Sequence, residues 1–189
     1  SYNIEVKSLN QTADDSPLRV LNPDIESEMI NIIKNAQKNG DTVGGKFQVI
    51  ISGAPYGLGS YTSWNRKINA KLAESISSIN AIKSVSFGKD SSSSSFGSEL
   101  HDEIEYSNNQ YKRTNNNSGG IEGGMSNGQN ILINAEMKPL STLTKPLKSI
   151  DIKTKKTKLA HKERTDSCAV PAASIIAESM VCITILDSI

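Results

Sequence analysis

Long hydrophobic runs are missing from this chain of 189 residues, 36% of which are hydrophobic and whose mean hydropathy is -0.38. No apolar run approaches the roughly 20 residues that a membrane-spanning helix needs. The sequence also does not open with a basic segment followed by an apolar one. We therefore expect a cytoplasmic protein with no membrane segment. The length fits a single domain over residues 1–189, with room for a hydrophobic core.

Cysteine and histidine are scarce. Cys168 and Cys182 are the only cysteines, and neither belongs to a CxxC or Cys/His cluster. This spacing excludes a disulfide framework and a zinc finger, so we expect no metal site and interpret both cysteines as small buried hydrophobic residues. The two histidines, His101 and His161, lie in polar surroundings that favour solvated or locally hydrogen-bonded side chains.

Several common enzyme signatures are also absent. The sequence has no Ser/His/Asp order with a nucleophile elbow. Its glycine-rich stretch, residues 119–129, lacks the Lys-Ser/Thr of a P-loop and does not open a helix. An ordinary nucleotide-binding fold is therefore not expected. The net charge of +1 gives no global attraction to nucleic acid.

The hydrophobic periodicity predicts an α+β fold rather than a doubly wound parallel sheet. Two long helices and one final helix alternate with strands joined by short turns. The predicted order is a strand at 4–9, a helix from 23, a strand at 44–52, a helix at 64–79, a strand at 82–87, a long loop at 91–117, a strand at 130–137, a basic loop at 148–164 and a helix from about 171. In this scheme Trp64 belongs to the core.

The helix that begins at Pro23 has clear start and stop signals. Asn22 can cap its first turn, Pro23 has a dispensable N–H group, and Gly40 supplies a stop. Its apolar residues fall on one face, so we expect an amphipathic helix packed on the core.

The glycine-rich stretch is the first candidate for function, because five glycines occur in ten residues directly before a strand. Such a cluster indicates unusual dihedrals or a ligand lying on main-chain N–H groups; the alternative is a mobile surface loop. Lys138, Pro139, Leu140, Ser141 and Thr142 follow the strand directly. An ammonium and hydroxyls at a strand end suit an anion site.

Arg164 and Asp166 form a second candidate near the start of the last helix. Together they can place a guanidinium and a carboxylate beside one pocket, and a helix N-terminus favours anions. The alternative is an Asp166 that caps the helix and an Arg164 in a salt bridge. Between Lys148 and Arg164, six lysines and one arginine face two acidic residues, which is typical of a solvated loop but could also form a wall for a phosphorylated ligand.

These motifs together resemble the C-terminal half of chorismate synthase. The resemblance runs from about residue 21 to residue 189, although Thr165 stands where the family more usually has His, Ser or Phe. It rests on Gly40-Asp41-Thr42-Val43-Gly44-Gly45, Gly57-Leu58-Gly59, Ser78-Ile79-Asn80-Ala81, His101-Asp102-Glu103-Ile104, the glycine-rich stretch, Lys138-Pro139 and the segment from Arg164 to Glu178. It implies a sandwich of helices with antiparallel sheets and a homotetramer.

The resemblance also implies chemistry. Members of the family are lyases of the shikimate pathway of aromatic amino acid biosynthesis, flavoproteins that use reduced FMN, with a link to NADP. They convert 5-enolpyruvylshikimate 3-phosphate to chorismate by a 1,4-anti elimination of phosphate. Asp166 would help relay a proton, and Arg164 would stabilise substrate charge. The family's flavin contacts fall on Asn80, Ala81, Gly123, Lys138, Pro139, Leu140, Ser141, Thr142 and Arg164. We expect the glycine main chain, Lys138 and the Arg164/Asp166 pair to converge on one site.

The family's N-terminal half, with its Gly-x-Ser-His-Gly and Arg-Ser-x-Arg motifs, does not occur in the sequence. We therefore expect this chain to hold half a site and to be inactive alone, as a fragment or a natural truncation. The alternative is a non-catalytic module for assembly or anion binding. Nucleic-acid binding through residues 148–164 is a weaker hypothesis, because no aromatic residue lies in that segment.

Overall fold

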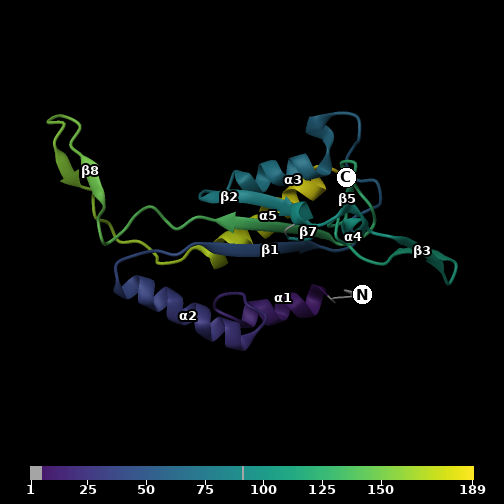
Figure 1. The fold of residues 1–189 in the computed structure, drawn as a ribbon, viewed down its shortest axis with the longest axis horizontal. Coiled ribbons are helices and arrows are strands. Elements are labelled where there is room, and N and C mark those ends of the chain that lie inside the picture. The colour runs from purple at the N-terminus through teal and green to yellow at the C-terminus, as the bar shows by residue number, and fades with distance from the viewer. Residues whose placement is uncertain (1–5, 91) are drawn as a thin grey trace.

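The computed structural model describes residues 6–90 and 92–189. Figure 1 shows a central sheet with helices beside it and a hairpin projecting at each end of the long axis. The elements, in chain order, are α1 (Val6–Asp15), α2 (Pro23–Lys38), β1 (Gly45–Ile51), the 3-10 helix η1 (Trp64–Arg66), α3 (Ile68–Ser77), β2 (Ile82–Phe87), the 3-10 helix η2 (Ser92–Ser94), α4 (Gly97–Leu100), β3 (Ile104–Ser107), β4 (Gln110–Arg113), β5 (Ile121–Glu122), β6 (Met125–Ser126), β7 (Ile131–Met137), β8 (Lys148–Ile150), β9 (Thr157–Leu159) and α5 (Val170–Leu186).

Strand β7 is the centre of a three-stranded antiparallel sheet with the order β1-β7-β2. Its alternating pattern is confirmed, because Ile131, Ile133, Ala135 and Met137 are buried. They pack with α3 and α5, which contact each other and the sheet. The other face is polar, as expected of a sheet covered on one side: Gln48 donates to Asn134 across the sheet at 2.7 Å. The α+β prediction is confirmed.

The region before the sheet differs from the sequence prediction in two ways. Residues 6–15 form helix α1, so the strand predicted at 4–9 is wrong over its described residues; Ile4 lies outside them. Helix α2 begins at Pro23 with Asn22 as its cap, as predicted. However, none of its residues is buried, and Ile25, Met29 and Ile32 are 42–51% exposed. The prediction that this helix packs on the core is wrong.

The aromatic and cysteine assignments also need correction. Trp64 is 80% exposed, because the helix predicted from residue 64 is broken and only its continuation from Ile68 packs in the core. Of the cysteines, Cys168 is half-buried and Cys182 is exposed. Helix α5 is apolar on all sides, so residues on the face away from the sheet reach solvent in this chain.

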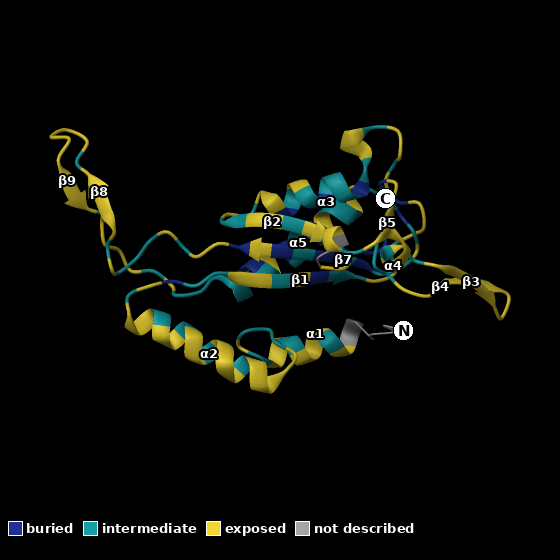
Figure 2. Ribbon diagram, viewed as in Figure 1, coloured by how far each residue is buried: buried dark blue, intermediate teal, exposed yellow. Residues whose placement is uncertain are grey.

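The long loop predicted at 91–117 contains a β3–β4 hairpin, whose turn places Asn108 and Asn109 at φ angles of 53° and 59°. Asparagine tolerates this left-handed conformation, so the Asn-Asn pair was a hairpin signal that periodicity alone did not reveal. The basic segment likewise forms the β8–β9 hairpin, both strands of which are exposed (Figure 2). No helix in the described part of the chain is long and apolar enough to cross a membrane.

Candidate functional site

Two predicted site segments meet where β7 ends. The Lys138 N–H donates to the carbonyl of Ala81 at 2.9 Å, which fixes Asn80 and Ala81 beside the segment 138–142. Ala81 has φ 69°, a left-handed conformation that is unusual for a residue with a Cβ atom. Such backbone strain clusters at functional sites, so it marks this junction as a candidate.

A buried threonine joins the third segment to the same end of the sheet. Thr42 is 6% exposed, and its hydroxyl donates to the Leu140 carbonyl at 2.7 Å. The next residue, Val43, donates its N–H to the Ser167 carbonyl at 2.8 Å. A Cβ at Gly44 would lie 2.2 Å from the Met137 carbonyl oxygen, so only glycine permits this approach. Residues 42–44 therefore clamp 138–140 to the segment that holds Arg164 and Asp166.

The charged side chains at this end point into solvent. Lys138 is exposed, and its ammonium group donates to the neighbouring Pro139 carbonyl at 3.4 Å. A guanidinium nitrogen of Arg164 lies 3.8 Å from a carboxylate oxygen of Asp166, and the two side chains are 91% and 75% exposed. An ion pair this exposed contributes little to stability. The cations are thus available to bind an anion.

Asp166 does not cap the final helix. Helix α5 begins at Val170, and its N-cap residue is Ala169, which makes no side-chain capping bond. The alternative of a capping Asp166 is therefore wrong, and so is the expectation that Arg164 and Asp166 sit at the helix start. They belong to the extended segment that precedes it.

Gly123 lies at the opposite end of β7. The glycine-rich stretch leads into the first residue of β7, whereas Lys138 follows the last, so the seven-residue strand separates them by about 20 Å. The expectation that all the predicted residues converge within this chain is wrong. One end gathers Asn80, Ala81, the segment 138–142, Arg164 and Asp166, and the other holds Gly123.

The predicted unusual dihedrals of the glycine-rich stretch are confirmed, since its five glycines have φ angles of 60–94°. Three of them serve packing. Added Cβ atoms would lie 2.2 Å from the Gly88 nitrogen at Gly119, 2.5 Å from the Asn130 oxygen at Gly120, and 2.6 Å from the Lys67 side chain at Gly124. At Gly123 a Cβ would meet nothing within 4 Å. Close backbone packing thus explains most of the cluster.

Asp102 anchors the segment before the glycine-rich stretch, a role that sequence reasoning did not assign. Its carboxylate accepts from the N–H groups of Asn117 at 2.7 Å and Ser118 at 3.0 Å. Burial raises the pKa of Asp102, but the hydrogen bonds from Ser118 and Asn117 outweigh it, and the net pKa lies below the usual 3.8. The aspartate two residues before a strand was the available signal.

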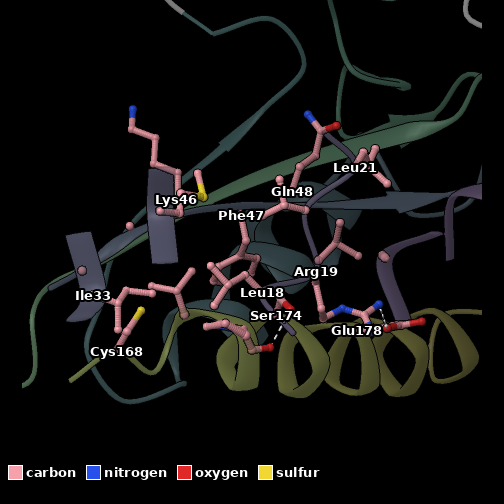
Figure 3. Close-up of a pocket in the computed structure, with 18 of the residues that line it drawn as sticks. Leu18, Arg19, Leu21, Ile33, Lys46, Phe47, Gln48, Cys168, Ser174 and Glu178 are labelled. Atoms are coloured by element: carbon pink, nitrogen blue, oxygen red, sulfur yellow. Dashed lines mark hydrogen bonds and ion pairs between the residues drawn. The ribbon is translucent and has the colours of Figure 1, made fainter. Parts of the chain in front are cut away.

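Two cavities lie near these elements. A shallow hollow of about 400 Å³ beside α5 is lined by Asn80 and Met137, at the end of the sheet described above. A larger, mainly apolar groove of about 500 Å³ lies between α2 and β1 and contains none of the predicted site residues (Figure 3). Within the described residues, no group of three or more His, Cys, Asp or Glu could hold a metal ion.

Comparisons with known proteins give one consistent family. A family model described as chorismate synthase matches residues 1–189. The chain is 51% identical to a chorismate synthase of Alkaliphilus metalliredigens over 92% of its own length and 46% of that protein. It is 49% identical to one of Listeria welshimeri, over 93% of this chain and 46% of the relative. It is also 44% identical to chorismate synthase 2 of Bacillus cereus, over 99% of this chain and 48% of the relative.

A solved structure shows the same fold. A crystal structure of a chorismate synthase superimposes with a TM-score of 0.78 and 34% identity, covering 96% of this chain and 47% of that one. This likeness supports the predicted arrangement of helices with antiparallel sheets. The chain spans about half the length of the relatives that it matches. From the sequence and the fold together, the chain belongs to the chorismate synthase family.

Proposed function

We propose that this chain forms part of an enzyme that converts 5-enolpyruvylshikimate 3-phosphate to chorismate by 1,4-anti elimination of phosphate, with reduced FMN as cofactor. The observation that carries the proposal is the 51% identity to a named chorismate synthase, together with the meeting of Ala81 and Lys138 at the end of the sheet where the segment that holds Arg164 is also attached. The relatives carry the enzyme's name, which favours catalysis over a non-catalytic binding module.

The residues at this end fit an anionic, partly apolar cofactor. Exposed cationic heads of Lys138 and Arg164 suit phosphate, and Ser141 and Thr142 add hydroxyl donors. Asn80, Ala81, Pro139 and Leu140 supply adjoining main chain and apolar surface. These residues would hold the flavin; Gly123, at the other end of β7, lies outside this cluster. When bound, the reduced flavin supplies electron density to the substrate and recovers it, so it is needed but not consumed.

Within this chain, the charged residues would have two roles, charge stabilisation and proton transfer. Arg164 and Lys138 would hold the substrate's negative charge and offset the charge that builds on the leaving phosphate, because preorganised cations stabilise developing anions. Asp166, with its exposed carboxylate 3.8 Å from Arg164, would take part in relaying the departing proton. The remaining groups would come from the portion of the relatives that lies outside this chain. We further propose that the complete enzyme is a cytoplasmic homotetramer.

A chimera tests the proposal. This chain replaces the 176 matched residues in the full-length Alkaliphilus metalliredigens relative, and chorismate formation is measured with reduced FMN. We expect turnover from the chimera and none from the isolated chain. Lys138→Ala should weaken FMN binding about 10-fold or more, the loss of one charge-assisted contact. Lys153→Ala, an exposed lysine of the β8–β9 hairpin, is the matched control.

The aspartate has its own test. Asp166→Asn should lower kcat in the chimera at least about 100-fold, the usual contribution of a positioned acid–base group, while FMN affinity changes little. A folded, flavin-binding chimera that forms no chorismate, or full activity in Asp166→Asn, would contradict the assigned chemistry.

A further inference from the structure

Asparagine is followed directly by glycine at two places in the chain, Asn39-Gly40 and Asn127-Gly128. Such a pair can react with itself, because the glycine nitrogen carries no neighbouring side chain that hinders its attack on the asparagine Cγ atom. Glycine also reaches backbone conformations that other residues avoid, which helps the two atoms to meet. The structure places the two pairs in different surroundings, so we expect their reactivity to differ.

Asn127 is held by three hydrogen bonds at the start of β7. Its N–H donates to the Gly120 carbonyl at 2.9 Å. Its side-chain oxygen accepts from the Gln129 N–H at 3.1 Å, and its side-chain nitrogen donates to Ser118 at 3.5 Å. These bonds must break together before the side chain can turn to the Gly128 nitrogen.

Asn39 is the exposed C-cap residue of α2. Within residues 6–90 and 92–189, its side chain makes no hydrogen bond. The Gly40 N–H donates to the Gln37 carbonyl at 3.1 Å. The Asp41 N–H donates to the Ala36 carbonyl at 2.9 Å, which completes a Schellman motif with the glycine at φ 70°. One turn of helix end thus shields the attacking nitrogen.

That last turn of α2 is weakly held. None of the residues of the helix is buried. Helix ends with few buried contacts open with a small free energy, whereas elements packed in the core open only with a free energy near that of global unfolding. The Gly40 nitrogen is therefore released far more often than the backbone around Asn127.

We propose that Asn39 is a site of spontaneous deamidation. The Gly40 nitrogen loses its proton and bonds to the Cγ atom of Asn39, and the side-chain nitrogen leaves with a proton as ammonia. The product is a cyclic imide. Water then opens the ring at either carbonyl group, which gives aspartate or isoaspartate at position 39. Water is the only co-reactant, so the reaction needs no oxidant, reductant or enzyme.

The modified position adjoins the segment that holds residues 138–145. The Gly40 carbonyl accepts from the Lys145 N–H at 2.9 Å, and the Thr42 hydroxyl donates to the Leu140 carbonyl at 2.7 Å. Isoaspartate lengthens the main chain between α2 and these contacts. Either product also places a carboxylate at the negative end of the α2 dipole, where it is unfavourable. Deamidation should therefore loosen residues 138–145.

This loosening predicts weaker FMN binding in the chimera. The effect on FMN rests on the proposed function, whereas the deamidation itself does not. The two parts therefore need separate measurements.

Peptide mapping of the chimera by mass spectrometry tests the deamidation. After incubation at mildly alkaline pH, conversion of Asn39 should exceed conversion of Asn127 by about 10-fold or more, because the two sites differ in the free energy of local opening. In urea-unfolded protein both pairs should react at similar rates, since the local sequence is the same. Conversion should also accelerate as pH rises, because the glycine nitrogen attacks after losing its proton.

Asn39→Gln is the matched variant, because its longer side chain must close a larger ring and reacts more slowly. It should suppress conversion at position 39 and leave conversion at Asn127 unchanged. FMN affinity is then measured before and after incubation. It should fall several-fold in the wild-type chimera and stay constant in Asn39→Gln.

Two results would overturn the deamidation site. The first is equal conversion of Asn39 and Asn127 in the folded chimera, which would show that sequence alone sets the rate. The second is conversion of Asn39 in urea but not in the folded protein, which would show that the end of α2 stays closed. Complete conversion with unchanged FMN affinity would instead refute the coupling to residues 138–145 and confirm the site.

Discussion

The two ends of β7 are built in different ways. At its start, the glycine-rich stretch packs main chain against main chain, and Ser126 is 2% exposed with its hydroxyl accepting from the Leu58 N–H at 2.8 Å. At its end, the Lys138 N–H donates to the Ala81 carbonyl and the Thr42 hydroxyl donates to the Leu140 carbonyl, while the charged side chains remain in solvent.

This contrast separates scaffolding from binding capacity. A cluster of glycines with positive φ angles signals close backbone approach, and here the approaching atoms are mainly the protein's own. The open end has fewer unusual dihedrals but offers ammonium, guanidinium and hydroxyl groups. We therefore expect the free energy of unfolding to fall most on substitution of a packed glycine at the start of β7. Substitution of Thr42, at the end of β7, should have a smaller effect.

Gly119→Ala should have the largest effect. The added Cβ would meet the Gly88 nitrogen at 2.2 Å in a left-handed backbone, for a loss of about 2–5 kcal/mol in the free energy of unfolding. Gly123→Ala has the same dihedral penalty without the clash and should cost only about 1 kcal/mol. Urea unfolding of both variants measures the difference. If both variants lose the same free energy of unfolding, close packing is not the reason that position 119 needs glycine.

Thr42→Val should have the next largest effect, at the other end of β7. It keeps the side-chain shape but leaves the Leu140 carbonyl without its buried donor, which costs about 2 kcal/mol. Thr42→Ser keeps the hydroxyl and should retain more of this stability. In the chimera, Thr42→Val should also weaken FMN binding by loosening 138–142. Unchanged stability in urea unfolding would contradict the role of Thr42 as a clamp.

Asp102→Ala should have a smaller effect, about 1 kcal/mol, because the carboxylate is partly exposed. The pKa of Asp102 is lowered in the folded state, so its contribution is complete above the unfolded pKa near 3.8 and is lost as pH falls through the lower folded pKa. The wild-type minus variant stability should thus be constant near pH 6–7 and shrink below about pH 4. A difference that grows on acidification would show that the hydrogen bonds to Asn117 and Ser118 do not favour the carboxylate.

The sequence predicted correctly those elements that are specified by residues close together in the chain. The alternation from Ile131 to Met137 identified the central strand, and Asn22-Pro23 marked the start of α2, because period and capping are properties of a few adjacent residues. The family motifs also pointed to the segments around Ala81, Lys138 and Arg164, which the structure brings to one end. Their roles in binding and catalysis stay predictions.

Other assignments failed because they depended on distant contacts. The apolar spacing that included Trp64 continued into α3, but the chain breaks at Lys67, where Ile68 must donate to the Gly124 carbonyl. The exposed Trp64 follows from that long-range bond. Similarly, the apolar stripe of α2 was recognised, but what covers it was not.

The sequence by itself determined the family, the α+β class and the inward face of β7, because these follow from residue identity and short-range period. Only the tertiary structure decided that Gly123 and Lys138 lie at opposite ends of one strand, and that α2 and the edge of β1 border an open groove. The physical reason is that burial of apolar surface has no intrinsic direction. A pattern specifies which face avoids water, and the rest of the fold specifies what that face meets.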